Sequence, residues 1–170
     1  MALNRDSLWV GLIFLFATAN LGTAQPLSRA TLEWTVDLGQ PAAGGPALLG
    51  PADSAQDVIL ALSSGKVVVI SPRGEKLAGM EMDLTPAGTP VAGQGKIFAA
   101  DAWGSIYAFD VSGKRLWKHE RVERSGGGFN YPVLTDVDGD GAAEVIMSGS
   151  RGTLYAVDTR GRLRLEVHVT

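Results

Sequence analysis

The stretch Gly104-Ser-Ile-Tyr-Ala-Phe-Asp-Val-Ser-Gly-Lys-Arg-Leu-Trp117 decides the fold, because its pattern occurs three times in the chain. Matching stretches begin at Gly65 and at Gly152. Each reads as an apolar strand, a short polar turn that ends in glycine, and a second strand. Self-similarity of this kind indicates a repeat architecture, in which one supersecondary unit stacks on the next.

Two more strands precede each of these stretches. A proline opens the first and an apolar run forms the second: Pro46 with 57–62, Pro90 with 96–100, and Pro132 with 144–147. The prolines are 44 and 42 residues apart, from 46 to 90 and from 90 to 132. Four short strands in about 40 residues are typical of a β-propeller blade.

The predicted fold is therefore all-β. It is a partial β-propeller of about three four-stranded blades near 46–84, 90–123 and 132–169, preceded by one N-terminal strand at 31–38 that carries Trp34. We number the blades one to three and letter the strands of each blade A to D. A β-sandwich built from similar strands is the alternative.

The first 24 residues have the composition of a secretory signal peptide. Arg5 lies in a short n-region, residues 8–19 are apolar, and Gly22-Thr23-Ala24 supplies small residues for cleavage before Gln25. The apolar run is short for a membrane span, and an uncleaved anchor is the alternative. We expect a secreted or periplasmic protein with a propeller domain at 25–170 and no stable membrane span after cleavage.

Composition excludes several classes of function. The net charge of −3 and the pI of about 5.3 argue against a nucleic-acid-binding surface. The chain has no cysteine, so it forms no disulfide and carries out no thiol chemistry. A hydrophobic content of 45% together with 22 glycines and 8 prolines fits a folded β protein with many turns.

A loop between two predicted strands of blade three reads Asp136-Val-Asp-Gly-Asp-Gly-Ala-Ala-Glu144. Its first three acids alternate, so they turn toward one centre, and Gly141 permits a sharp turn beneath them. Oxygen ligands suit Ca²⁺, and the loop has no histidine or cysteine for zinc or copper. The predicted Ca²⁺ ligands are Asp136, Asp138, Asp140, the carbonyl oxygen of Ala142, and Glu144.

This loop is not an EF-hand. Position 12 of an EF-hand is a bidentate glutamate, but here it is Met147, and strands instead of helices are predicted on both sides. The alternative is an Asp/Gly-rich turn that binds no ion. Four carboxylates in one turn repel each other strongly without a cation, which favours the calcium site.

Two family resemblances rest on these motifs. The segment Thr135-Asp-Val-Asp-Gly-Asp-Gly-Ala-Ala-Glu-Val-Ile146 resembles the FG-GAP/VCBS repeats of integrin-type propellers, whose A–B loops bind calcium. The segment 104–117 is similar to the repeat of PQQ-like (quinoprotein-type) propellers. Propellers generally close with about six to eight blades, so three blades leave two open sides. We expect a truncated or split propeller that self-association or further blades complete.

The blade geometry predicts which loops share an end of the propeller. A–B and C–D turns lie at one end, and B–C turns and D–A connections lie at the other. The second end carries the candidate ligand-binding residues Trp103, Phe129, Tyr131 and Arg151. An exposed aromatic ring there can stack on a sugar or on a partner's side chain, whereas packing between blades is the structural alternative. The calcium loop lies at the opposite end, where its expected role is to fasten a hairpin.

These features favour a secreted or periplasmic, non-catalytic, calcium-binding propeller segment that contacts a protein or a glycan. A quinoprotein stacks its cofactor in a complete ring, often beside paired cysteines, and this chain has neither feature. Two alternatives remain open. One is the N-terminal part of a quinoprotein or polysaccharide-active enzyme, and the other is a scaffold in outer-membrane protein assembly.

Overall fold

The structure is a computed structural model that describes residues 33–120, 131–148 and 152–168. These residues form three antiparallel four-stranded sheets, which confirms the predicted all-β partial propeller. Blade one consists of β1 (Ala47–Leu49), β2 (Asp57–Ala61), β3 (Lys66–Ile70) and β4 (Lys76–Glu81). Blade two consists of β5 (Val91–Gly93), β6 (Lys96–Ala100), β7 (Ile106–Asp110) and β8 (Arg115–His119). Blade three consists of β9 (Val133–Thr135), β10 (Glu144–Ser148), β11 (Thr153–Asp158) and β12 (Leu163–His168).

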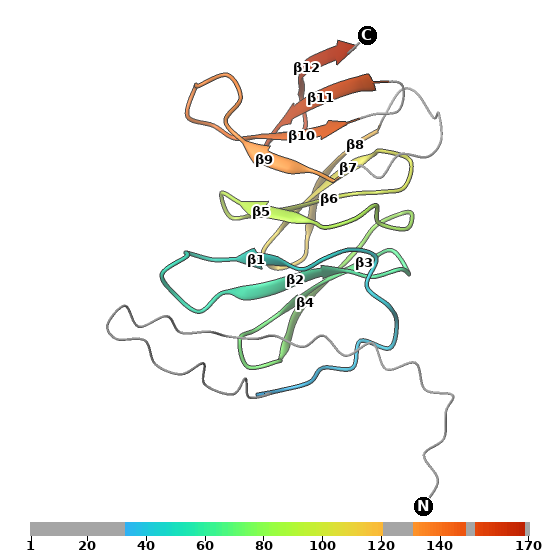
Figure 1. Cartoon of the computed structure of the whole chain (residues 1–170), viewed down its shortest axis with the longest axis vertical. Helices are drawn as coiled ribbons and strands as arrows, with labels where there is room; N and C mark the ends of the chain where they lie inside the picture. The colour runs from blue at the N-terminus through green and yellow to red at the C-terminus, as the bar shows by residue number, and fades with distance from the viewer. Residues whose placement is uncertain (1–32, 121–130, 149–151, 169–170) are drawn as a thin grey trace, which may run out of the picture.

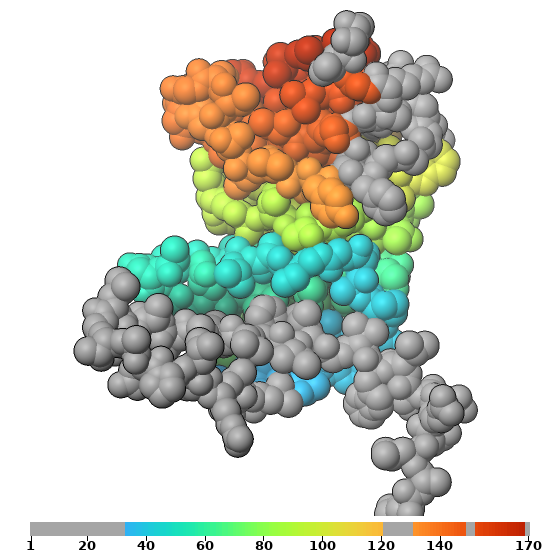
Figure 2. Space-filling model, in the orientation of Figure 1, coloured from blue at the N-terminus to red at the C-terminus, as the bar shows by residue number. Residues whose placement is uncertain are grey.

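The three sheets stack along the long axis of the molecule in chain order (Figure 1). In the space-filling view they form successive layers, coloured from cyan through green to red (Figure 2). The short A strands contact one another, β1 with β5 and β5 with β9. Neighbouring inner strands of this kind line the axis of a propeller.

Two hydrophobic cores hold the blades together. The first joins blades one and two, where Ile59, Val69 and Met80 pack with Ile97 and Tyr107. The second joins blades two and three and contains Phe98, Ala100, Ile106, Ala108, Val145, Met147 and Val157. Because blade two is covered on both faces, its B and C strands are continuous apolar runs instead of alternating ones.

The turn between strands C and D is built alike in every blade. In blade two, the backbone N–H groups of Ser112 and Lys114 each donate to Asp110 Oδ1 at 3.0 Å. Asp158 accepts the equivalent bonds in blade three, and the hydroxyl of Ser71 does so in blade one. The side chains of Asp110 and Asp158 therefore cap these turns.

Residues 33–38 do not form the strand predicted at 31–38, whose first two residues lie outside the described ranges. The backbone is extended, and Trp34, Val36 and Leu38 pack against the outer face of blade one. A strand assignment requires a hydrogen-bonded neighbour, and no strand of the described residues pairs with this segment. The predicted strand is therefore not observed at residues 33–38, although alternate residues of this segment are partly buried.

The chain enters blades one and two in the same way. Ala42 bridges Leu62 at the first entry, and Pro86 bridges Asp101 at the second. The next residues also match, because Ala43 N donates to Ala61 O at 2.7 Å and Ala87 N donates to Ala100 O at 2.8 Å. These bonds align 34–42 with 78–86, so the N-terminal segment occupies the place of a D strand from a preceding blade.

Candidate functional site

The loop between β9 and β10 brings three carboxylates together. One oxygen from each of Asp136, Asp138 and Glu144 lies within 4.8 Å of the other two. Two oxygens that share a calcium ion at roughly 2.4 Å are at most about 4.8 Å apart, so this cluster fits a common Ca²⁺ centre. Glu144 is buried while the two aspartates are exposed, which leaves one open side for further ligands.

Hydrogen bonds to its own backbone shape this loop. Asp136 accepts from Gly139 N at 2.7 Å and from Gly141 N at 2.8 Å, so both of its carboxylate oxygens are engaged. Glu144 Oε2 accepts from Val137 N at 3.0 Å. The two glycines have φ values of 77° and 86°, which side chains rarely adopt and which let the loop wind around the acids.

One predicted ligand, Asp140, is not part of the cluster. It accepts from the backbone N–H of Ala142 at 2.8 Å. A cation of the chain itself also reaches the loop, since Arg164 of β12 lies 3.3 Å from Asp138 Oδ2. The Asp138 carboxylate raises the pKa of Arg164. The roles of Asp140 and of the Ala142 carbonyl oxygen as ligands stay predictions.

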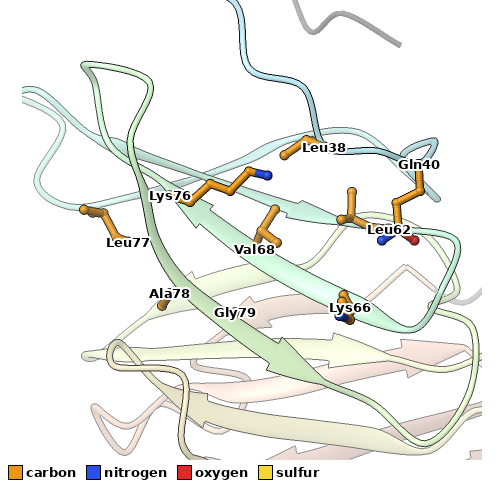
Figure 3. A pocket seen from close by; sticks show the side chains of 9 residues that line it. All are labelled: Leu38, Gln40, Leu62, Lys66, Val68, Lys76, Leu77, Ala78 and Gly79. Carbon is orange, nitrogen blue, oxygen red and sulfur yellow. The ribbon is translucent and has the colours of Figure 1, made fainter. Parts of the chain in front are cut away.

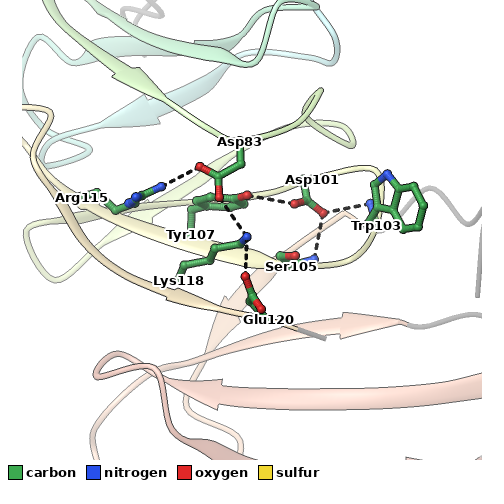
Figure 4. A network of polar contacts seen from close by, with 8 residues as sticks. All are labelled: Asp83, Asp101, Trp103, Ser105, Tyr107, Arg115, Lys118 and Glu120. Carbon is green, nitrogen blue, oxygen red and sulfur yellow. Dashed lines mark hydrogen bonds and ion pairs between the residues drawn. The ribbon is translucent and has the colours of Figure 1, made fainter. Parts of the chain in front are cut away.

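The B–C turn of blade two is organised by a buried aspartate that the sequence analysis missed. Asp101 is fully buried, and its Oδ1 accepts from the backbone N–H groups of Trp103 and Ser105, each at 2.9 Å (Figure 4). Its Oδ2 accepts from the hydroxyl of Tyr107 at 3.0 Å. The residue at this position is Leu62 in blade one and Gly149 in blade three. An aspartate in blade two alone was the signal in the sequence that could have identified it.

A charged cluster continues from this aspartate toward blade one. Lys118 Nζ lies 2.9 Å from Asp83 Oδ2, 2.8 Å from Glu120 Oε1 and 5.4 Å from the centroid of the Tyr107 ring. Arg115 holds the other oxygen of Asp83 at 2.9 Å. The hydrogen bonds to Glu120 and then to Asp83 raise the pKa of Lys118. Because Asp83 follows β4, this cluster ties blade one to the D strand of blade two.

Trp103 and Tyr131 are the two candidate ligand-binding residues that the structure describes. Trp103 is 51% exposed, and Tyr131 is 54% exposed with its ring against Gly88. Both lie on B–C or D–A segments, at the end of the blades opposite the calcium loop. Phe129 and Arg151 lie outside the described residues. The role of these aromatic residues in ligand binding stays a prediction.

A hollow of about 400 Å³ lies on the outer face of blade one (Figure 3). Figure 3 shows Leu62 and Val68 pointing toward the segment that carries Leu38 and Gln40. The full lining consists of Leu38, Gln40, Leu62, Lys66, Val68, Lys76, Leu77, Ala78 and Gly79. The sequence analysis did not identify this hollow, because no local motif marks it.

Comparisons with known proteins agree with the PQQ-like repeat. The profile of a PQQ-like family, described as outer membrane protein assembly factor BamB, matches residues 32–170. A comparison with curated protein sequences found no significant match. The resemblance of 135–146 to FG-GAP/VCBS repeats stays a prediction.

Solved structures of low sequence identity share the fold. The crystal structure of BamB from Moraxella catarrhalis superposes with a TM-score of 0.70 at 17% identity, over 82% of this chain and 41% of that one. The structure of BBS1N in complex with ARL6DN, soaked with mercury, gives 0.66 at 16% identity, over 84% of this chain and 41% of that one. This chain thus spans about two fifths of the length of these structures.

The part of the chain that the structure describes contains no helix long and apolar enough to cross a membrane.

Proposed function

Because the chain belongs to the family of the outer membrane protein assembly factor BamB, we propose that it is a non-catalytic scaffold that binds a protein partner during outer-membrane assembly, outside the cytoplasm. The observation that carries this proposal is the family match over residues 32–170. It favours the scaffold over a general role in protein or glycan contact, which was the first expectation from the sequence.

The end of the blades that carries Trp103 and Tyr131 suits contact with a partner. Large aromatic side chains give binding area at low cost in conformational entropy, and they are enriched among the residues that dominate interface energies. The turn that presents Trp103 is held by two hydrogen bonds to the buried Asp101. A ring presented by such an ordered turn loses little freedom when a partner binds.

The polar group at the heart of blade two has a structural role, because it holds the turn that presents Trp103. Tyr107 is fully buried, and its hydroxyl donates to Asp101. Burial and the neighbouring Asp101 carboxylate raise the pKa of Tyr107 to about 12. A phenol of that pKa inside the core is poorly suited to exchange protons with a substrate near neutral pH.

Site-specific photo-crosslinking in cells tests the scaffold proposal. A photoreactive amino acid in place of Trp103 or Tyr131 is expected to form adducts with outer-membrane assembly proteins, identified by mass spectrometry. Val111 is a matched control, because it is 51% exposed but lies in a C–D turn at the opposite end of the blades. Equal labelling from all three positions, or adducts with unrelated proteins only, would argue against this contact surface.

We further propose that the loop at 136–144 binds Ca²⁺ and fastens the β9–β10 hairpin. The support is the close approach of three carboxylate oxygens, one of them from the buried Glu144. Asp138→Ala removes one of the three and is expected to abolish stabilisation by calcium, measured as the shift in Tm between calcium and chelator. Thr135→Ala changes the flanking strand but no clustered acid and should keep the shift. Equal melting of the wild type with calcium and with chelator would rule out this site.

The outer face of blade three supports the proposal that another sheet completes this side. Val133, Leu165 and Val167 are 55%, 37% and 41% exposed there. The strand pairings place Val133 and Leu165 where blade two has Val91 and Trp117, which blade three covers. A self-associated species in light scattering, dispersed by Leu165→Lys, would support an open apolar face. A monodisperse monomer that does not bind an apolar dye would contradict it.

A further inference from the structure

The hollow of blade one and the charged cluster of blade two occupy the same place in the repeat. Val68 pairs with Gly79 across β3 and β4, as Tyr107 pairs with Lys118 across β7 and β8. The matched entry bridges equate Leu62 with Asp101. Figures 3 and 4 therefore show one structural position with two different fillings.

Substitution of small residues for large ones explains the hollow. Blade two fills this position with the ring of Tyr107 and the long side chain of Lys118, whereas blade one has Val68 and Gly79. The alignment of 34–42 with 78–86 places Gly39 where blade two has Asp83. Blade one thus lacks the ring and the carboxylate that occupy the position in blade two.

Blade one nevertheless has a cation at the position of the residue that pairs with this carboxylate in blade two. In blade two, Arg115 holds Asp83 at 2.9 Å. Lys76 stands at the equivalent position of β4, because Ala78 and Trp117 hold equivalent places two residues later. Lys76 lines the hollow and forms no ion pair with any of the described residues. A positive group without its carboxylate favours an anionic ligand here.

The other charges around the hollow are few. Lys66 also lines it and pairs with Glu81 at 3.6 Å, where both side chains are largely exposed. Such an exposed pair contributes little and is readily exchanged for another partner. Gln40 adds a neutral amide, and the rest of the lining is apolar or glycine. The site therefore has a largely apolar surface and a positive rim.

We propose that this hollow binds an aromatic side chain with an adjacent carboxylate on a partner polypeptide. The ligand would supply to blade one the two groups that Tyr107 and Asp83 supply to blade two. A volume of about 400 Å³ accommodates a phenol ring and a carboxylate. In blade two the position holds its own Tyr107 and Lys118 together with Asp83 of the preceding blade, whereas the segment that precedes blade one has Gly39 in place of that aspartate. Only the choice of a polypeptide as the ligand rests on the proposed scaffold function.

Nuclear magnetic resonance titration of the isotope-labelled full chain with acetyl-Tyr-Asp-amide tests this site. Saturable shifts are expected at Leu62, Val68 and Lys76. Acetyl-Tyr-Asn-amide lacks the carboxylate and acetyl-Ala-Asp-amide lacks the ring, so each should bind about tenfold more weakly. Equal affinities of the three peptides, shifts confined to other surfaces, or no saturation would overturn the proposal.

Variants of the chain locate the binding. Lys76→Gln removes the proposed cation and should weaken acetyl-Tyr-Asp-amide about tenfold, whereas Lys114→Gln, an exposed lysine of the blade-two turn, should leave it unchanged. Val68→Tyr places the ring of blade two in the hollow and should abolish binding. If that variant does not fold, Lys76→Gln decides alone, and unchanged affinity overturns the proposal. Peptide binding without crosslinks from Trp103 and Tyr131 would retain this site and reject the proposed contact surface.

Discussion

The boundary between blades two and three and the boundary between blades one and two are fastened by different means. At the boundary between blades two and three, Trp117 Nε1 donates to Thr159 O at 3.1 Å, and its indole ring lies against Gly161. Trp34 makes the same contact on blade one, donating to Pro72 O at 2.8 Å with its ring against Gly74. A tryptophan from one strand position thus docks on the C–D turn of the next blade.

The boundary between blades one and two has Ala78 at this position. Without an indole ring between them, the backbones come close, and a Cβ on Gly113 would lie 3.0 Å from Gly79 O. The salt bridges from Asp83 to Arg115 and Lys118 cross the same boundary. The comparison indicates that blades of this repeat are joined in two ways. One is a partly buried tryptophan ring with a directed hydrogen bond, and the other is a close approach of the two backbones together with ion pairs.

Removal of the docked tryptophan should have the largest effect. Trp117→Ala loses contacts with Phe98 and Gly161 as well as the bond to Thr159, and we expect it to lower the free energy of unfolding by about 3 kcal/mol. Urea unfolding measures the change. Trp103→Ala is the control and should cost less than about 1 kcal/mol because that ring is half exposed. Similar losses of unfolding free energy in the two variants would show that docking of Trp117 on the C–D turn adds little stability.

Substitution of the glycine beneath the ring should have a smaller effect. Gly161 has a φ of 86°, and an added Cβ would lie 2.9 Å from the Trp117 ring. Gly161→Ala combines backbone strain with this clash, and we expect a loss of about 2–3 kcal/mol in urea unfolding. Gly95 has a similar φ of 70° but open space around it, so Gly95→Ala should show the backbone strain alone, about 1 kcal/mol. Equal losses would mean that the ring moves aside freely.

The sequence predicted the fold well because the repeat is carried by local patterns. Turn glycines such as Gly113 and apolar runs such as 106–110 depend on neighbours in the same hairpin, so they are visible without a structure. The acidic loop was also visible, and three of its acids, Asp136, Asp138 and Glu144, lie close together, whereas the role of Asp140 as a ligand stays a prediction.

The polar cluster and the hollow were not predictable from a single repeat. Asp83 and Lys118 are distant in sequence, and neither belongs to a motif. The hollow arises from what blade one lacks relative to blade two, which requires an accurate alignment of Val68 with Tyr107. The strand expected at 31–38 failed for a related reason, because its pattern indicates burial on one face but says nothing of a neighbouring strand.

The smallest expected effect concerns the charges at the boundary between blades one and two. Hydrogen bonds from Lys118 and then from Arg115 lower the pKa of Asp83 below 3.8. A carboxyl group with a lower pKa in the folded state adds stability above its unfolded pKa and loses it as the pH falls through the folded value. The Tm of Asp83→Asn should therefore lie slightly below that of the wild type at pH 6, and the difference should shrink as the pH falls.

Melting curves between pH 6 and pH 2.5, at low and high salt, measure this difference. Salt should shrink it, because Asp83 and Arg115 are about half exposed and their attraction is screened. Asp53→Asn, in the exposed β1–β2 loop, is a matched loss of one carboxylate that has no such ion pair in the described structure. A constant difference at all pH values would show that Asp83 acts through packing, in which case close backbone approach alone would define the boundary between blades one and two.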